Sequence, residues 1–578
     1  MISVLLIWIY MIITIGTAGL LTACLSKRLP GYRPGDPEAI LLSGLVFVTV
    51  YAEVWSLFGK VGIAANICLC VILAVCVFIF RRPLTLTASD AFVVVRSRRI
   101  YLPVVIVIMI VMAYGASHGM MHYDTGLYHA QAVRWIEEFG SVPGLANLHT
   151  RLGYNSSAFV LNALYSFAAT GQSYHVTGAF CALLLACECV LPIVTKESPL
   201  ISISGFCRVM GLYYLFTIFD EMVSPASDYY MVCLAFILII RWISASEKSD
   251  AAGADMAGTE ELTAQCAMLS FLAAFILTVK LSGALFILLA VIPGVTLLRS
   301  HRIKEFALCI LAGIVTICPY LIRNAVLSGW LLYPSTTIDL FNFDWKVPVD
   351  IASYDYKEIQ VYGRGYTDVA RFDDPVTVWF PDWLRAASLT DRILICAAIV
   401  GVVYFVIKCI CYVCLRKRDD FGSQNIYRLY TEGVVSAGFL FWLLTSPLMR
   451  YGCLYVYLCD AVIWGGVLVR IVSGRVQLKK ILYGLLALLL VYKSCMLVVE
   501  SARVFRSDTW IRQQDYDTFD VHAYELTDEA GTNAIGFYAP DSGDCAGYDA
   551  FPSSPWDMDG LIVLRGNDIS DGFKNIMR

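Results

Sequence analysis

Long apolar segments recur along the whole chain, and they constrain the fold more strongly than any other feature of the sequence. Segments 2–25 and 391–415, for example, each hold the roughly 20 mostly apolar residues that a helix needs to cross a hydrocarbon layer about 30 Å thick. Hydrophobic residues make up 58% of the 578 positions, and charged residues make up only 16%. The sequence therefore predicts an all-α polytopic membrane protein whose main partner is the lipid bilayer. The net charge of −4 gives no sign of nucleic-acid binding.

Fourteen segments are predicted to span the membrane. They are residues 2–25, 38–58, 61–80, 100–117, 174–194, 199–219, 229–244, 266–279, 282–298, 306–322, 391–415, 430–447, 454–471 and 481–499. Segment 156–170 is also apolar, but it is short and lacks a charged exit, so we expect a helix that lies along the membrane interface. If this segment spans the bilayer instead, the orientation of every later segment is inverted.

Lysine and arginine are concentrated in one set of connections between these segments. The set consists of residues 26–37, 81–99, 195–198, 245–265, 299–305, 416–429 and 472–480, and it holds 20 Lys and Arg. Since cytoplasmic loops are enriched in these residues, this set is predicted to be cytoplasmic and both termini to be extracytoplasmic. Three large segments then lie outside, at 118–173, 323–390 and 500–578, and chemistry or recognition is expected there.

The first of these outer segments carries polar residues directly after a predicted membrane helix. Residues 122–129 read HYDTGLYH, and Asp124 lies close enough to the membrane for its carboxylate to reach a lipid-linked substrate. The alternative is that Asp124 only caps the helix that follows, a role that Asp often has. That helix, at 130–139, has one apolar and one polar face, so we expect it to lie on the membrane and to end at Gly140.

Four of the seven histidines lie in the same outer segment, at His118, His122, His129 and His149. These side chains could ligate a metal, but they have no Cys partner and no spacing typical of a metal site. We therefore favour binding of phosphate or hydroxyl groups.

Further charged residues lie at the predicted outer ends of later helices. Asp228 either stabilises the N-terminus of its helix or supplies a second carboxylate to the site of Asp124. Lys280 interrupts the apolar stretch 267–298, where its ammonium group needs water, a carboxylate or a phosphate, unless it lies in a surface hairpin turn. Arg323 and Arg450 lie on the same side, where arginine anchors helices or binds anionic groups.

These polar segments, taken in order, resemble the bacterial GT-C superfamily of membrane glycosyltransferases, including relatives of the protein mannosyltransferases and of the lipopolysaccharide sugar transferases. The segments that carry the resemblance are 122–155, 224–228, 323–334 and 543–573, and the similarity extends over about residues 100–578. It is greatest to an uncharacterised branch of cell-envelope proteins. The chain departs from the superfamily in two ways: three helices in 1–99 precede the Asp124 loop, where the core usually has one, and no Asp-x-Asp motif is present, which leaves metal dependence open.

The resemblance implies a GT-C-like bundle of about 14 transmembrane helices, with interfacial helices in the first large outer loop. It places the catalytic module at 100–499 and a small extracytoplasmic α/β segment at 500–578. The implied reaction transfers a sugar, with inversion, from a polyprenyl-phosphate-linked donor to a cell-envelope glycan, lipid or protein at the outer face of the bacterial cytoplasmic membrane. Asp124 would take the proton of the acceptor hydroxyl, and Asp228 would orient the acceptor or a metal. Cations would bind the leaving phosphate.

The residues implied in substrate binding are His122, Tyr128, His129, Arg151, Asn155, Lys280, Arg323, Asn324, Arg450 and Tyr451. The sequence requires no cofactor, although a divalent metal is compatible with it. Two alternatives stay open. One is a transporter or flippase of lipid-linked sugars, whose pathway the same charges would line, and the other is a polysaccharide polymerase or ligase. A transporter more often has two internally similar halves, which this sequence does not show.

Overall fold

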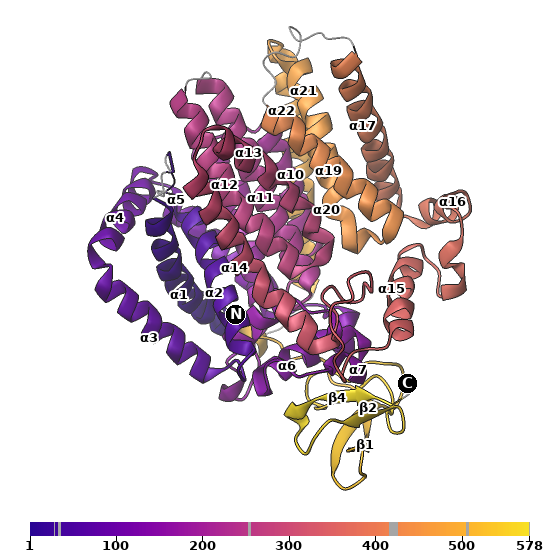
Figure 1. Ribbon diagram of the computed structural model, residues 1–578. Coiled ribbons are helices and arrows are strands. Elements are labelled where there is room, and N and C mark those ends of the chain that lie inside the picture. The colour runs from indigo at the N-terminus through magenta and orange to yellow at the C-terminus, as the bar shows by residue number, and fades with distance from the viewer. Residues whose placement is uncertain are drawn as a thin grey trace.

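Long helices form most of the protein (Figure 1). The computed structural model describes residues 1–27, 29, 31–32, 36–252, 256–414, 426–503 and 508–576. Within these residues, ten helical segments are long and apolar enough to cross a membrane. They are α1 (Ile2–Ser26), α2 (Pro37–Ser56), α9 (Thr177–Val194), α11 (Ser227–Ala252), α12 (Met256–Val279), η4 with α13 (Leu281–Ala290 and Val291–Arg299), α14 (Ile303–Ser328), α17 (Leu389–Cys414), α20 with η6 and α21 (Met449–Cys459, Asp460–Trp464 and Gly465–Val472) and α22 (Val476–Arg503). The structure thus agrees with a multi-pass helical membrane protein.

The expected count of fourteen spans is not confirmed. The other four predicted segments form α3 (Ile63–Ile79), α5 (Tyr101–Ser117), α10 (Ile203–Thr217) and α19 (Ile426–Thr445). Of these, α3 and α5 have 17 residues and α10 has 15. At 1.5 Å per residue such helices are about 22 to 26 Å long, which is shorter than the roughly 30 Å of a hydrocarbon layer.

A sharp bend joins α3 to the next helix, α4 (Arg81–Ser97), and together these two helices count as an eleventh candidate span. Their axes differ by 96°, and they form the arm beside α1 and α2 in Figure 1. The sequence predicted a cytoplasmic loop over 81–99, and the loop is wrong, because all but the last two of these residues are helical; the cytoplasmic location stays a prediction. Arg81 and Arg82 follow the apolar stretch of α3, but they begin α4 instead of a loop.

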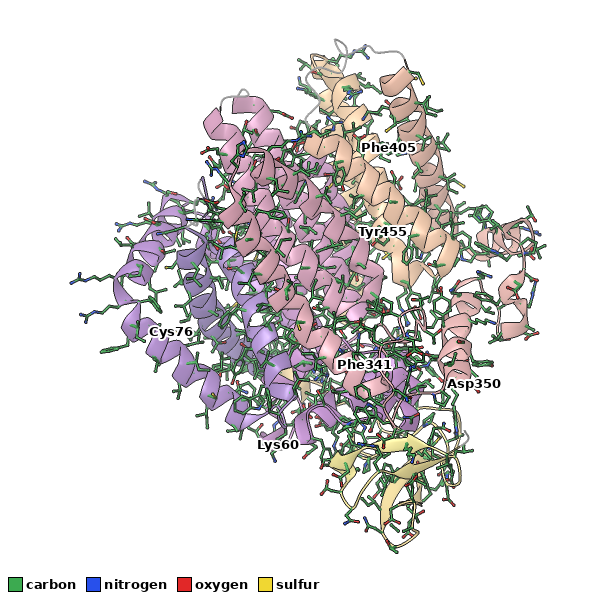
Figure 2. All side chains as sticks on the ribbon, in the orientation of Figure 1. Lys60, Cys76, Phe341, Asp350, Phe405 and Tyr455 are labelled. Carbon is green, nitrogen blue, oxygen red and sulfur yellow. The ribbon has the colours of Figure 1, made fainter. Side chains whose placement is uncertain are left out.

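The two ends of the bundle differ. One end carries α6 (Ala130–Glu138), α7 (Leu145–Leu148), α15 (Val349–Gly363) and the C-terminal strands, and we call it the tail end (Figure 1). We call the opposite end the loop end. In Figure 2, Lys60, Phe341 and Asp350 lie toward the tail end, Tyr455 lies within the bundle, and Phe405 lies toward the loop end.

The first large segment at the tail end is a set of short helices packed inside the protein. After η1 (Thr125–His129) and α6 come α7, η2 (Thr150–Gly153), α8 (Ser157–Tyr165) and η3 (Ala168–Thr170). All nine residues of α8 are buried and this helix is too short to cross a bilayer, whereas Ala168–Thr170 at the end of segment 156–170 are not buried. Seven of the nine residues of α6 are also buried, and the prediction of a helix lying on the membrane is wrong for α6. Its Gln131, Arg134 and Glu137 side chains bind the C-terminal segment, while Glu138 is exposed.

The helix α6 ends where the sequence predicted. Gly140 has a φ of +81°, and its N–H donates to the carbonyl of Trp135 at 3.1 Å. A Cβ atom at this position would lie 2.4 Å from the carbonyl oxygen of Gly59, so glycine is needed both for the turn and for the close approach of α2.

The C-terminal segment contains two small antiparallel sheets. Strands β1 (Val521–Thr527) and β2 (Ala534–Pro540) pair so that Val521 faces Pro540 and Thr527 faces Ala534. Strands β3 (Ile562–Leu564) and β4 (Phe573–Asn575) form the second sheet. Short helical turns, η7 (Asp508–Trp510) and η8 (Ile569–Asp571), accompany them. The expected small C-terminal segment with strands is present, and we call residues 508–576 the tail.

Candidate active site

Four charged side chains from different helices meet at the tail end of the bundle: Asp124, Asp228, Lys280 and Arg450. The Arg450 guanidinium donates from Nη2 to Oδ2 of Asp124 at 2.6 Å, and its Nε lies 3.6 Å from Oδ2 of Asp228. The Lys280 ammonium forms an ion pair with Oδ1 of Asp228. Asp228 therefore bridges the two cations. We call these four residues the charge cluster.

Asp124 takes part in the cluster because of the turn that carries it. Its backbone is helical, with φ −62° and ψ −15°, and it directly precedes the π-helical turn η1. The Asp124 N–H donates to Nδ1 of His122 at 3.0 Å, but the Asp124 carboxylate caps no backbone N–H of η1. The reading of Asp124 as a helix cap is therefore wrong, since its carboxylate pairs with Arg450.

Asp228 and Lys280 come from helix ends that face each other. Asp228 lies in the first turn of α11, where the helix dipole favours a carboxylate. Lys280 lies at the break between α12 and η4, in an extended conformation with φ −158°. The two structural alternatives predicted for these residues thus hold in part. Asp228 lies at the start of a helix, and Lys280 lies at a break between helices. Each side chain is nevertheless directed into the charge cluster.

Arg450, in the first turn of α20, contacts the most members of the site. Its guanidinium also contacts the His122 ring, and it donates to the Tyr451 hydroxyl at 3.3 Å. The Tyr451 ring lies 4.6 Å from Nζ of Lys280 and 5.0 Å from Cζ of Arg450, so one aromatic face borders both cations.

The charges in the cluster balance, and the cations are its more accessible part. Side-chain exposure is 25% for Lys280 and 23% for Arg450, compared with 12% for Asp124 and 4% for Asp228. An anion approaching from outside therefore meets the cations before it meets the carboxylates.

The surroundings of Asp124 decide its protonation state. Burial alone would raise the pKa of the Asp124 carboxyl, but the Arg450 guanidinium, with smaller effects from the nearby histidines and Arg151, outweighs burial and holds that pKa below its ordinary value. Burial lowers the pKa of His129 to about 3. Burial and the Arg450 charge also lower the pKa of His122. Asp124 is therefore ionised and both histidines are neutral at pH 7.

Several predicted substrate-binding residues form the wall behind the cluster. Tyr128 and His129 are buried in η1, with ring centroids 4.4 Å apart, and the His129 ring lies 6.4 Å from that of His122. Nη2 of Arg151 lies 3.7 Å from Oε2 of Glu358, a residue of α15. These residues support the cluster or act on it electrostatically, and none of the three pairs directly with Asp124.

The structure does not bring Arg323, Asn324 and Asn155 into the charge cluster. Arg323 is fully buried and donates to Oδ1 of Asn155 at 3.1 Å and to the Ser141 hydroxyl at 2.9 Å. Asn324 donates to the carbonyl of Leu331 at 2.9 Å. These residues tie α14 to the first outer segment, so their contacts are structural.

The tail covers the Asp124 loop, which sequence reasoning did not find. The carbonyl of Gly126 accepts the N–H groups of Ala546 and Gly547 at 3.2 and 2.9 Å. The hydroxyl of Tyr123 bonds Asp544, and the Cys545 thiol lies 3.9 Å from the carbonyl of Tyr123. These contacts join positions more than 400 residues apart, and the sequence of a single chain contains no local signal for them.

The tail also forms hydrogen bonds with α6. Gln131 donates to the carbonyls of Gly547 and Ala550, both at 2.8 Å, and Arg134 donates to the carbonyl of Tyr548 at 2.6 Å. Tyr548 in turn donates to Glu137 at 2.5 Å.

Metal binding finds no geometric support in the described part of the chain. Among the described residues, no group of three or more His, Cys, Asp or Glu side chains is placed to hold a metal ion. The four histidines of the first outer segment do not form a common ligand set there.

A sequence model of one protein family, described as Domain of unknown function (DUF8201), matches residues 1–457. The chain belongs to this family. No curated protein and no solved structure matches the chain. The DUF8201 match contains all four members of the charge cluster and Tyr451, whereas α22 and the tail lie beyond it.

Proposed function

We propose that this protein is a membrane glycosyltransferase, which transfers a sugar from a polyprenyl-phosphate carrier to a cell-envelope glycan, lipid or protein. The observation that carries the proposal is the charge cluster, in which two carboxylates and two cations from four separate segments meet at one end of an apolar bundle. This position suits a donor whose lipid chain stays in the bilayer while its phosphate and sugar reach the bundle end. We place this end on the extracytoplasmic side of a bacterial cytoplasmic membrane, because described connections rich in Lys and Arg, such as 299–305 and 472–480, lie at the loop end (Figure 1).

The cluster can exchange its internal ion pairs for pairs with the donor. A polyprenyl-phosphate sugar carries one negative charge, and the accessible Lys280 and Arg450 are placed to receive it. Once Arg450 turns to the phosphate, the effect that lowers the pKa of Asp124 weakens while burial persists. Binding of the donor thus makes Asp124 a stronger base at the moment when a base is needed.

The transfer step then balances in atoms and charge. The acceptor oxygen forms a bond to the anomeric carbon from the face opposite the phosphate, so the configuration inverts. The bond from that carbon to the phosphate oxygen breaks, and the electron pair leaves with the phosphate. The acceptor proton passes to Asp124. One negative charge therefore disappears from Asp124 as one appears on the polyprenyl phosphate, where Lys280 and Arg450 stabilise it. Asp228 keeps both cations in place throughout.

The test uses full-length protein in lipid nanodiscs with a panel of short-chain isoprenyl-phosphate hexoses and pentoses, and it measures the release of isoprenyl monophosphate. We expect turnover with at least one donor, and Asp124→Asn should lower it by roughly 10²- to 10⁴-fold, the usual cost of losing a general base. The amide keeps the size of the side chain, so the variant should still bind isoprenyl monophosphate. Asp382→Asn is the control, because Asp382 is an exposed carboxylate that pairs only with Arg385 on its own helix.

Two results would contradict the proposal. One is the absence of both turnover and binding across the whole donor panel. The other is movement of fluorescent donor between the leaflets of a vesicle with no cleavage of the sugar–phosphate bond, because that activity belongs to a flippase.

A further inference from the structure

A second charged region lies at the loop end of the bundle, away from the charge cluster, and it opens into a large cavity. The cavity has a volume of about 1190 Å³ and lies among α1, α2, α9, α11, α12 and α14. Helices α2, α12 and α14, which form its apolar wall, pack side by side (Figure 1). The proposed glycosyl transfer uses none of its residues.

The lining of this cavity changes along the direction of the helices, from charged at one end to apolar over the remainder. Charged residues of α2, α9, α10, α11 and α14, and of the turns beside α2, α4 and α9, surround its polar end. They are Asp36, Glu38, Arg98, Glu188, Glu197, Arg208, Arg241, Glu247, Lys248 and Glu305. Apolar side chains of α2, α12 and α14 form the remainder, among them Val46, Phe47, Leu272, Leu311 and Val315. A ligand that fills this space therefore has one charged end and one hydrocarbon end.

The depth of the cavity matches one leaflet of a bilayer. Its lining runs along α2 from Glu38 to Val50 and along α14 from Glu305 to Thr316. At 1.5 Å per residue these stretches are about 16 to 18 Å long, compared with about 15 Å for half of a hydrocarbon core. Phe47 and Leu311, which line the apolar part, are 39% and 57% exposed, so protein does not fill this space.

The charges at the polar end indicate which headgroup fits. Six carboxylates and four cations line the cavity, and this leaves an excess of two negative charges. Three of the four cations are already engaged within the protein: Arg98 pairs with Glu197, and Arg241 pairs with Asp36 at 2.6 Å and with Glu188 at 2.7 Å. Arg208 donates to the hydroxyls of Ser198 and Ser244, both at 2.9 Å.

Groups remain to receive both halves of a zwitterionic headgroup. The Nε–H of Arg241 is buried without a hydrogen-bond acceptor, and the exposed Lys248 lines the same end, so both suit a phosphate. Glu38, which accepts from the Tyr101 hydroxyl at 2.5 Å and adjoins the Asp36 carboxyl, and Glu305 suit an ammonium group. An excess of carboxylates opposes a bare phosphate monoester but accommodates a lipid that carries its own amine.

We propose that this cavity binds a membrane phospholipid with a primary-ammonium headgroup, of the phosphatidylethanolamine class, drawn from the leaflet at the loop end. The lipid chain lies against α2, α12 and α14, the ammonium group faces Glu38 and Glu305, and the phosphate faces Lys248 and Arg241. This site is independent of the proposed glycosyl transfer, because it lies at the other end of the bundle and shares no residue with the charge cluster.

The experiment measures bound lipid on delipidated full-length protein by native mass spectrometry. Four lipids are compared: phosphatidylethanolamine, phosphatidylcholine and phosphatidylglycerol with identical acyl chains, and an isoprenyl monophosphate. We expect phosphatidylethanolamine to bind about tenfold more tightly than phosphatidylcholine, because the methylated amine cannot donate hydrogen bonds to carboxylates. Glu38→Gln, which keeps an acceptor for Tyr101, should remove most of this preference. The control is Glu260→Gln. Glu260 also lies at the loop end of the bundle, near the start of α12, but it does not line the cavity.

A second variant tests the hydrocarbon part without disturbing the core. Leu311→Trp places a large side chain in the cavity at a half-exposed position, so the protein should fold, and binding of every phospholipid should fall by about tenfold or more. Leu488→Trp, on the exposed flank of α22, is its control. Equal or tighter binding of phosphatidylglycerol or of isoprenyl monophosphate would overturn the headgroup assignment. Unchanged binding in Leu311→Trp would overturn the cavity as the site.

Discussion

At the scale of single residues, the charge cluster is held together by opposite charges that need one another. Asp124 and Asp228 are nearly buried, and a buried charge without a partner is costly. Among the residues that the structure describes, Arg450 alone forms ion pairs with both carboxylates. Removing it leaves Asp228 with Lys280 and leaves Asp124 with only neutral histidines nearby and the more distant Arg151. The effect of each substitution on the remaining charges can therefore be predicted with its sign.

Replacing Arg450 with Met keeps much of the side-chain stem but removes the charge. Burial, no longer opposed by the guanidinium, then raises the pKa of Asp124. Because a general base must be ionised, the acid limb of the activity profile should shift to higher pH, in addition to a loss of phosphate binding. Isoprenyl-phosphate release measured from pH 4 to pH 9 checks this shift. Arg385→Met, at an exposed position on α16 (Val376–Ala386), should leave the profile unchanged. An unshifted acid limb in Arg450→Met would assign the essential base to another group.

A different carboxyl, Asp355 on α15, makes stability depend on pH. Burial raises the pKa of Asp355 to about 6, although the Tyr154 hydroxyl donates to it at 2.7 Å. Since this value lies above the unfolded value of about 3.9, the stabilising contribution is complete below pH 4 and is lost as the pH rises through 6. The loss amounts to at most roughly 3 kcal/mol, from about 1.4 kcal/mol per pH unit.

Thermal unfolding of wild type and of Asp355→Asn between pH 4 and pH 8 measures this effect. Wild type should lose stability relative to the variant as the pH rises, since the amide does not ionise. Asp382→Asn, at an exposed position, should follow wild type at every pH. Parallel curves for Asp355→Asn and wild type would show that Asp355 titrates normally.

Sequence reasoning found all four members of the charge cluster but could not separate them from Arg323. The position of a charge at the end of a predicted helix reveals its depth in the membrane. It does not reveal which way the side chain points around the helix axis, because that depends on neighbouring helices. Arg450 and Arg323 have the same depth by sequence, yet one faces Asp124 and the other faces Asn155 and Ser141.

At the scale of elements, α6 shows why an amphipathic pattern alone misleads. The polar face of α6 was expected to meet water and its apolar face to meet lipid. In the structure the apolar face packs on α8, and the polar face bonds the tail through Gln131, Arg134 and Glu137. A polar helix face indicates only that polar partners are needed, and a distant segment of the same chain supplies them here. The bend between α3 and α4 was missed for a related reason, since charged residues end a span but do not end a helix.

The contact between the tail and the Asp124 turn yields a prediction for one glycine. A Cβ atom at Gly126 would lie 2.6 Å from the ring of Phe519 in the tail. Gly126→Ala should therefore push this ring away and weaken the bonds from Ala546 and Gly547 to the Gly126 carbonyl. Overpacking of this kind typically costs about 1–3 kcal/mol.

The readout for Gly126→Ala is the rate at which protease cleaves the tail, together with the thermal midpoint. Cleavage should be faster than in wild type. Gly536→Ala is the matched control, because a Cβ atom there meets nothing within 4 Å and Gly536 lies in the same tail, on β2. Tail cleavage at the wild-type rate in Gly126→Ala would mean that the turn and the tail are not coupled.

At the scale of the whole molecule, the apolar segments predicted the class of protein, and the charges predicted which helix ends lie together. The sequence predicts one common face for Asp124, Asp228, Lys280 and Arg450, and the structure places them at one end of the bundle. The close association of tail and first outer segment was beyond prediction, because Gln131 and Gly547 are 416 positions apart. The large cavity at the loop end could not be predicted from the sequence either, since several helices form it together.

The orientation of the molecule is the last prediction, and the placement of the proposed reaction depends on it. The predicted cytoplasmic connections hold 20 of the 43 Lys and Arg in only 86 of the 578 positions, and these residues translocate poorly, so the tail end should face outward. Asp382→Cys places a thiol on exposed α16, and Lys304→Cys places one at the exposed start of α14, at the loop end. In intact cells a membrane-impermeant maleimide should label the first thiol and reach the second only after lysis, with wild type as the background for the native cysteines. The reverse pattern would put the charge cluster in the cytoplasm. A donor carrying its sugar on the outer leaflet could not then reach Asp124, and the proposed transfer would need a cytoplasmic acceptor.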